Sequence, residues 1–328
     1  MKITALLAAV LTCSAVAGDS FFSADGSTVT FAPLHETGHL LRVTVASGEV
    51  SKLPLPPVLK DASVPGLARG GLGEALFIAG PAVWVMKDDG TVKKVCDTGT
   101  MESPEDLFVA VKPGTPVTDW MFLSGVSKVE GSTPDFYARK PGQKSFGGVF
   151  CRRIQNVRSG CFSDDGRLFF TGNGDVWEGG IQTEDEPDGR MGVLVGARIA
   201  PVALLTTDEG NSGSVWVGGL NAAGKWLYAG LTGRHEGSIV RLPIPAKTLY
   251  SEMGDEKYTL RSHLDTMRAA LEKTEILVAE TGGLTAFCAC EVNGEARVFY
   301  RGEDDEGRGL FLWNGSGAPR RLANEPAE

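Results

Sequence analysis

The feature that most constrains this sequence is a phrase that recurs along the chain: a short apolar stretch, a tight turn ending in glycine, and an alternating strand. The copies, starting at Phe21, Cys161, Gly219 and Cys288, read FFSADGSTVTFA, CFSDDGRLFFTG, GLNAAGKWLYAG and, more loosely, CACEVNGEARVFY. The turn glycine of each copy is, in order, Gly26, Gly166, Gly224 and Gly294. Short apolar stretches joined by Asp-Gly, Ser-Gly or Asn-Gly steps indicate serial β-hairpins.

A second phrase follows the first and completes a repeating unit. It reads LLRVTVASGEVSKL from Leu40, AVWVMKDDGTVKKV from Ala82 and LFLWNGSGAPRRL from Leu310. The turn glycines are Gly48, Gly90 and Gly317, and a basic residue follows four positions later, at Lys52, Lys94 and Arg321. Two hairpins give four strands, and their recurrence about every 45–60 residues is the period of propeller blades.

A single four-stranded sheet of this size cannot bury both faces, so such units become stable only by stacking around an axis. We therefore predict an all-β fold, a β-propeller with six blades of four antiparallel strands. Seven blades are the alternative, because the third unit is degenerate and the stretch 191–211 is long; a pair of β-sandwiches fits the recurrence less well. The expected units are 19–57, 66–103, 104–153, 154–205, 212–250 and 276–325.

One helix is expected near residues 262–275, in the segment SHLDTMRAALEKTE between the fifth and sixth units. Leu264, Met267 and Leu271 form an apolar stripe, and Ser262 with Asp265 fits a capping box. Such an insertion serves either as a packed strap or as a lid over the axial opening.

The N-terminus has the pattern of a secretory signal peptide over residues 1–17. Lys2 precedes an apolar run, and Ala15 and Ala17 are the small residues before a cut at Gly18. Residues 18–328 then form a single propeller domain of an exported protein, periplasmic or extracellular, with no transmembrane segment. The mature chain carries 31 Lys and Arg against 41 Asp and Glu, a net charge of −10 that disfavours nucleic acid as a partner.

Five cysteines follow the predicted cut, at Cys96, Cys151, Cys161, Cys288 and Cys290. An odd number leaves at least one thiol free or paired between chains. Cys151 and Cys161 are the expected intrachain pair in an oxidising compartment, with buried free thiols as the equal alternative. Cys288 and Cys290 alternate on one strand and read as core residues.

The two phrases resemble the WD40-like repeats of the TolB type, whose units carry a motif close to FSPDGK. The best matches are FSADGSTVTF with LRVTVASGEVSKLP, and FSDDGRLFFTGNGDVWEGGI. The resemblance covers about half of the mature chain and implies a fold rather than an activity, because propellers with these repeats include scaffolds and accessory domains.

Two segments have residue types that could hold a metal. His35-Glu36-Thr37-Gly38-His39 spells HExxH, but Pro33 and Gly38 leave no room for the helix that zinc binding needs, so a hairpin loop is the better interpretation. Residues 183–189 place Glu184, Glu186 and Asp188 before Gly189, like the start of a calcium loop, but Val195 stands where a bidentate glutamate belongs.

A second acidic loop, Glu303 to Glu306, has oxygen ligands without a defined spacing and is better explained as a solvated connection between blades. Trp84, Trp177 and Trp313 recur at similar blade positions, which favours packing between blades over stacking on sugars.

No catalytic, cofactor-binding or metal-ligating residue is assigned from the sequence, and no cofactor is expected. The sequence favours a noncatalytic interaction or scaffold module of the cell envelope, with another envelope or secreted protein as its partner. The alternative is a propeller enzyme or glycan-binding protein, with carboxylates or a metal converging at the central axis after folding.

Overall fold

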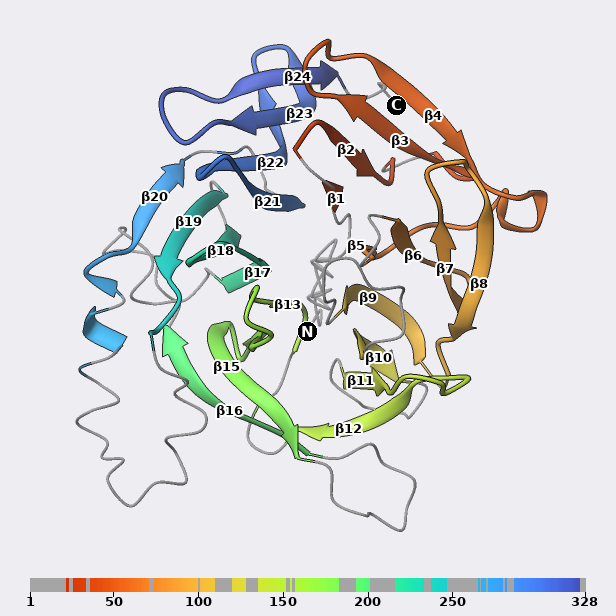
Figure 1. Ribbon diagram of the computed structural model, residues 1–328, viewed down its shortest axis with the longest axis horizontal. Coiled ribbons are helices and arrows are strands. Elements are labelled where there is room, and N and C mark those ends of the chain that lie inside the picture. The colour runs from red at the N-terminus through yellow and green to blue at the C-terminus, as the bar shows by residue number, and fades with distance from the viewer. Residues whose placement is uncertain are drawn as a thin grey trace, which may run out of the picture.

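The computed structural model forms a ring of six four-stranded blades around a central axis (Figure 1). It describes residues 22–23, 26–33, 36–70, 74–99, 101–109, 120–127, 135–151, 154, 157–182, 193–200, 216–232, 237–246, 265, 267–269, 271–279, 281 and 286–324. Each sheet is antiparallel within its blade, and the first strand of each blade lies nearest the axis. The prediction of a six-bladed, all-β propeller is confirmed.

The strands of blades 1 to 3 are β1 (Phe22–Ser23), β2 (Thr28–Phe31), β3 (His39–Thr44), β4 (Val50–Pro54); β5 (Leu67–Arg69), β6 (Ala75–Ala79), β7 (Ala82–Met86), β8 (Val92–Asp97); β9 (Met101–Val109), β10 (Met121–Ser127), β11 (Asp135–Arg139) and β12 (Gly147–Cys151). Those of blades 4 to 6 are β13 (Gly160–Phe162), β14 (Leu168–Gly172), β15 (Asp175–Gln182), β16 (Val193–Ala200); β17 (Trp216–Ala223), β18 (Trp226–Thr232), β19 (Ser238–Pro243), β20 (Glu275–Val278); β21 (Phe287–Val292), β22 (Glu295–Asp304), β23 (Gly307–Trp313) and β24 (Arg320–Asn324). A short 3-10 helix, η1 (Pro57–Leu59), follows blade 1.

The glycines of the first phrase lie in the turns between the first and second strands of blades 1, 4, 5 and 6. Their backbone is left-handed, with φ of 83° at Gly166 and 81° at Gly294, a conformation that side chains with a Cβ rarely adopt. The recurring glycine therefore marks the point at which each hairpin must reverse.

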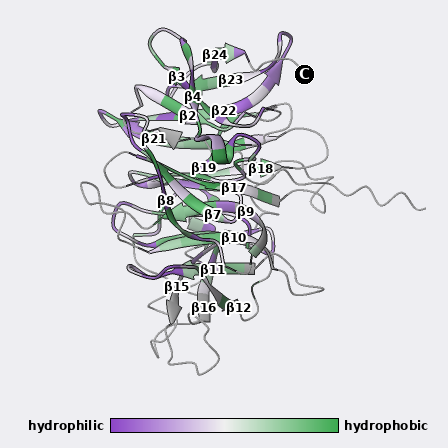
Figure 2. Cartoon of the chain, turned by 90° about the vertical axis from the view of Figure 1, so that its right-hand side faces the viewer, coloured by the Kyte–Doolittle hydropathy of each residue, from purple (hydrophilic) through white to green (hydrophobic). Residues whose placement is uncertain are grey.

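The hydrophobic core is divided into six clusters, one between each pair of adjacent blades. Strand residues alternate between the two faces, so neighbouring positions of one strand enter different clusters: in β6, Phe77 packs toward blade 1 while Leu76 and Ile78 pack toward blade 3. In Figure 2, hydrophobic residues lie within the stacked sheets and hydrophilic ones gather on turns. Each blade is therefore stabilised by both of its neighbours.

The ring closes between blade 6 and blade 1 without exchange of a strand, because both blades are built from contiguous chain. One core cluster joins them, with Phe31 and Val43 from blade 1 and Phe299 from blade 6 among its members. Three arginines donate hydrogen bonds to blade 1 carbonyls across this seam: Arg297 to Gly26 at 2.9 Å, Arg301 to Ala32 at 2.7 Å and Arg320 to Val45 at 3.1 Å.

Blades 3 and 4 are joined at their outer edges. β12 and β16 pair in parallel, with Phe150 opposite Val193 and Cys151 opposite Leu194, and the two blades become one eight-stranded sheet. Within the stretch 191–211, which suggested a seventh blade, the described residues 193–200 form the outer strand of blade 4.

The boundary predicted between the last two units is wrong. β20 (Glu275–Val278) pairs with β19, so it is the outer strand of blade 5 and not the start of blade 6. The boundary between the second and third units also shifts slightly, because Met101 already belongs to β9.

The inserted helix therefore lies within blade 5, between its third and fourth strands. The described residues of this segment, Asp265, Met267–Ala269 and Leu271, include the helical residues expected, whereas Ser262 and Leu264 lie outside the description. Met267 is buried, and Leu271 packs against the cluster between blades 4 and 5. The segment runs along the outer rim (Figure 1), which supports a packed strap rather than an axial lid.

Candidate functional site

The HExxH segment forms the connection between β2 and β3. Gly38 has a left-handed φ of 77° and His39 already begins β3, so its described part is not helical. His39 Nε2 lies 2.9 Å from Glu36 Oε2, and Lys52 Nζ donates to the same oxygen at 2.7 Å. The hydrogen bond from Lys52 lowers the pKa of Glu36. The interpretation as a hairpin loop is confirmed for Glu36 to His39; His35 lies outside the described residues.

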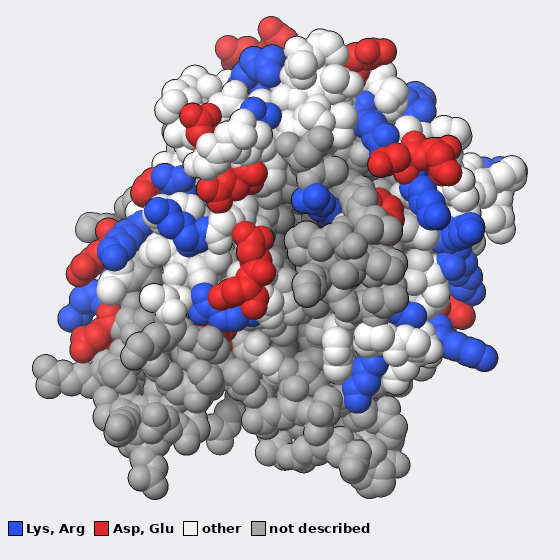
Figure 3. All heavy atoms as spheres, viewed as in Figure 1, with Lys and Arg blue, Asp and Glu red and all other residues white. Residues whose placement is uncertain are grey.

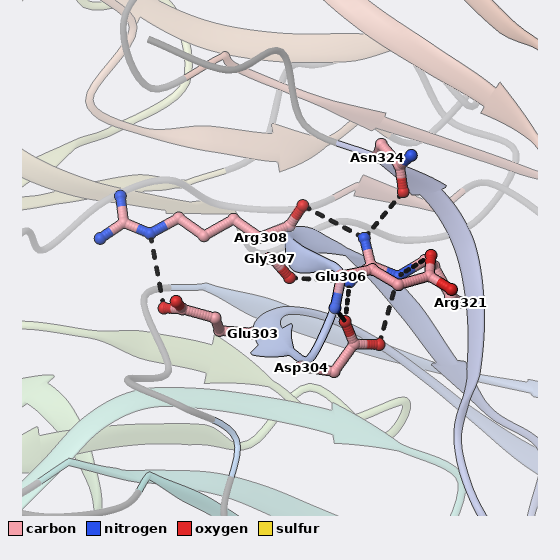
Figure 4. Close-up of polar contacts among 7 residues, drawn as sticks. All are labelled: Glu303, Asp304, Glu306, Gly307, Arg308, Arg321 and Asn324. Carbon is pink, nitrogen blue, oxygen red and sulfur yellow. Dashed lines mark hydrogen bonds and ion pairs between the residues drawn. The ribbon is translucent and has the colours of Figure 1, made fainter.

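The acidic turn Glu303–Glu306 connects β22 to β23 within blade 6, rather than joining two blades as expected. Arg321, on the outer strand β24, reaches into this turn (Figure 4). Its guanidinium donates to both carboxylate oxygens of Asp304 and, at 2.7 Å, to the carbonyl of Gly307. It also reaches Asn324 Oδ1 at 2.8 Å. The guanidinium of Arg321 thus engages both carboxylate oxygens of Asp304, which a calcium ion bound in this turn would also need.

These contacts give a role to the basic residue of the second phrase in two of its three copies, whereas Lys94 of blade 2 pairs with Asp97 on its own strand. In blade 1, Lys52 of β4 binds Glu36 in the connection between the second and third strands. In blade 6, Arg321 of β24 binds Asp304 in the equivalent connection. A basic side chain on the outer strand therefore fastens that connection in both blades.

We expect the hydrogen bonds between Arg321 and Asp304 to stabilise the folded protein at neutral pH, and we expect this stabilisation to disappear in acid. Hydrogen bonds from Arg321 lower the pKa of Asp304. A carboxyl with a lowered pKa in the folded protein contributes stability above its unfolded pKa of about 3.9, and this contribution disappears as pH falls through the folded value. Arg321→Ala should therefore lower the melting temperature by roughly 2 °C at pH 7, and the difference from the native protein should shrink as the pH falls below about 4.

Thermal melts across this pH range would measure the effect, with Arg268→Ala, an exposed position on the helical segment, as the control. A difference between Arg321→Ala and the native protein that stays constant from pH 7 to pH 2.5 would contradict the role given to Asp304.

The three recurring tryptophans pack between blades, as expected. Trp84 and Trp177 lie on the third strands β7 and β15, and each donates its indole N–H to the carbonyl five residues earlier: Ala79 at 3.0 Å and Gly172 at 2.8 Å. Trp313, on β23, is buried in the cluster between blades 5 and 6. These contacts fix each indole within the blade stack.

Cys96, Cys161, Cys288 and Cys290 are free thiols, so the expected pairing of Cys161 with Cys151 is wrong and the alternative of a buried free thiol holds for Cys161. Cys151 ends the outer strand β12 of blade 3, whereas Cys161 lies on the inner strand β13 of blade 4. Strands spaced about 4.8 Å apart put these positions much farther apart than a disulfide allows. Burial raises the pKa of Cys96 to about 11 and also raises the pKa of Cys161 and Cys288, so these thiols stay protonated. Cys288 and Cys290 contact the cluster between blades 6 and 1, as predicted.

Sequence reasoning missed several buried charged side chains. Glu178, on β15, is 1% exposed and lies 3.4 Å from the guanidinium of Arg167, which also donates to the carbonyl of Pro245 at 2.8 Å. Arg301 and Arg139 are buried as well, with 2% and 7% of their surface exposed. The sequence gives little signal of this, because a charge in an alternating strand ordinarily faces solvent.

Within the described residues, no three His, Cys, Asp or Glu side chains come together in a way that could hold a metal ion. The acidic loop 183–189 lies outside the description. No helix in the described part of the chain is long and apolar enough to cross a membrane.

Neither a family model nor a curated protein matches the sequence. Solved structures do match it in fold. A gluconolactonase from Xanthomonas campestris is 12% identical, with 91% of this chain and 88% of that chain covered and a TM-score of 0.53. The calcium-binding protein regucalcin from Agrobacterium tumefaciens is 13% identical, with 95% and 94% covered and a TM-score of 0.54. A chain of a nidogen/laminin complex is 12% identical, with 87% and 88% covered and a TM-score of 0.52.

The chain has the fold of a six-bladed β-propeller. At this level of identity the likeness is one of architecture, and propellers of similar architecture perform unrelated tasks. The function of this propeller must therefore be argued from its own residues.

Proposed function

We propose that this propeller is an exported, noncatalytic interaction module that presents its surface to another protein of the cell envelope. In this proposal residues 1–17 are a signal peptide removed before Gly18, and residues 18–328 are the mature domain. The repeats are related to the WD40-like repeats of the TolB type.

The observation that carries the proposal concerns the two of the three segments with metal-binding residue types that lie within the described residues. In the HExxH segment and in the acidic turn, Glu36 and Asp304 are bound by Lys52 and Arg321 of the same blade. Paired carboxylates of this kind fasten a hairpin and are not poised to ligate an ion or transfer a proton. The nidogen/laminin complex supports the proposal only in part, as a propeller of similar fold found in an assembly of proteins.

The second candidate is a propeller enzyme or glycan-binding protein with carboxylates or a metal at the axis. A gluconolactonase and a calcium-binding regucalcin share this architecture, which makes the candidate worth testing directly.

The test begins with the protein purified from the envelope fraction of cells that express the full chain. Its intact mass should correspond to a chain starting at Gly18. Thermal melts with calcium, zinc or a chelator should then leave the melting temperature unchanged within about 1 °C, because an ion that binds only the native state must raise it.

A clear rise with one ion would favour the axial enzyme or glycan-binding candidate over the interaction module. Crosslinking in intact cells tests directly whether the propeller binds another protein. We expect a discrete adduct with one envelope protein. The absence of such an adduct, with an intact and folded propeller, would count against the proposal.

A further inference from the structure

Arg139 is a charged residue buried between two blades. It ends β11, the third strand of blade 3, and shares a face with Tyr137, which packs in the cluster between blades 2 and 3. Only 7% of its surface is exposed. Its Nε donates to the carbonyl of Gln143 at 2.7 Å, which directs the guanidinium toward the turn after β11.

Part of this guanidinium has no acceptor among the described residues. Nη1 is buried and reaches no hydrogen-bond acceptor in the described part of the chain. Among the described residues no carboxylate pairs with Arg139, and Asp97, on the adjoining end of β8, is held instead by Lys94. Burying an unpaired charge is strongly unfavourable, so an anion bound next to this guanidinium would offset the cost of burying it.

The turn after β11 places Arg139 against blade 2. Asp97 N–H donates to the carbonyl of Lys144 at 3.1 Å, and Phe146 N–H donates back to the carbonyl of Asp97 at 3.4 Å. Gln143, which binds Arg139, is therefore next to the residue that contacts the end of β8. The guanidinium lies at the rim end of the boundary between blades 2 and 3.

Exposed lysines surround this boundary although the whole chain is acidic, with a net charge of −9. Lys144 is exposed on the turn, and Lys93 is exposed on β8, opposite Val85 in the register with β7. In Figure 3, Lys and Arg side chains gather along this rim, over β8. A local excess of positive charge attracts anions to a buried guanidinium beneath it.

We propose that Arg139 is the base of an oxyanion-binding site at the rim between blades 2 and 3, with Lys144 at its entrance. The ligand group is a carboxylate or a phosphate, because both present paired oxygens to the planar N–H fork of arginine. This site is independent of the function proposed above.

The proposal is tested by thermal melts of the mature propeller at low ionic strength, with inorganic phosphate or a hexaglutamate peptide as probes and chloride of equal ionic strength as the reference. We expect at least one probe to raise the melting temperature by about 3 °C near saturation. A response to phosphate alone identifies a phosphate ligand, whereas a response to the peptide identifies a carboxylate ligand.

Arg139→Met should abolish the response, and Arg139→Lys, which keeps the charge without the fork, should weaken it about tenfold in affinity. Because a substitution at a buried position can prevent folding, Lys144→Gln serves as an exposed second variant, expected to weaken binding about threefold. Arg268→Met on the helical segment is the matched control and should leave the response intact. The proposal is overturned if neither probe raises the melting temperature, or if Arg139→Met responds like the native protein.

Discussion

Replacing Arg301 with alanine is expected to lower the free energy of unfolding by about 3–5 kcal/mol, measured by urea denaturation. Arg301 is 2% exposed on β22 and is among the largest fully buried side chains of the described chain. Its Nη2 donates to the carbonyl of Ala32 at 2.7 Å, and its guanidinium lies 5.6 Å from the ring centre of Phe31. The substitution would leave a cavity and an unpaired buried carbonyl at the seam that closes the ring.

Arg301→Met separates the loss of side-chain volume from the loss of the hydrogen bond to Ala32. Methionine restores much of the apolar volume but cannot donate to Ala32, so we expect a cost of about 1–3 kcal/mol, the size of the desolvation penalty of a buried carbonyl. Arg268→Ala, on the exposed side of the helical segment, should change stability by less than about 0.5 kcal/mol. If Arg301→Ala were as stable as this control, the seam would not depend on the buried guanidinium.

Gly160→Ala is the second substitution with a large expected effect, about 2–3 kcal/mol of destabilisation. Gly160 lies on the inner strand β13 of blade 4, and a Cβ built there would lie 2.6–2.7 Å from two ring carbons of Phe108. That ring cannot easily move, because it stacks on Phe122 and contacts Phe136, each at 5.5 Å between centroids. Even one methyl group would force blades 3 and 4 apart at the axis.

Gly148→Ala is the matched control, since Gly148 lies on β12 with no heavy atom closer than 3.9 Å to the added Cβ. It should cost less than about 1 kcal/mol. Phe108→Leu should partly rescue Gly160→Ala in a double-mutant cycle measured by urea denaturation, because the two residues share one contact. Strictly additive effects would show that the contact is not the cause.

The sequence predicted the architecture well because each blade repeats a local code. The turn glycines Gly26 and Gly166 and the alternating strands after them specify hairpins independently of the rest of the chain. The spacing of the units, rather than a phrase in every unit, gives six blades, because the third unit is degenerate. The boundary near residue 276 was misplaced because blade 5 is interrupted: the strap separates β19 from β20, and Glu275–Val278 reads as the opening of a new unit.

What the sequence could not provide is the radial position of a residue. Cys151 and Cys161 are ten positions apart and seemed well placed to pair, yet one lies at an outer edge and the other at an inner edge. The same limit applies to Arg139 and Arg301, whose burial depends on the neighbouring blade. Their contacts form only when the blades stack against one another, so no local sequence pattern predicts their burial.

The way the ring closes has a consequence for how the chain can be rearranged. Because no blade borrows a strand from the opposite end of the polypeptide, the seam between blades 6 and 1 is built like most of the other blade boundaries. A circular permutant that joins the original N- and C-termini and has its new termini at one of most blade boundaries should therefore still contain six whole blades. The boundary between blades 3 and 4 is the exception. The pairing of β12 with β16 joins those two blades into one sheet, so they should be kept together in a permuted chain.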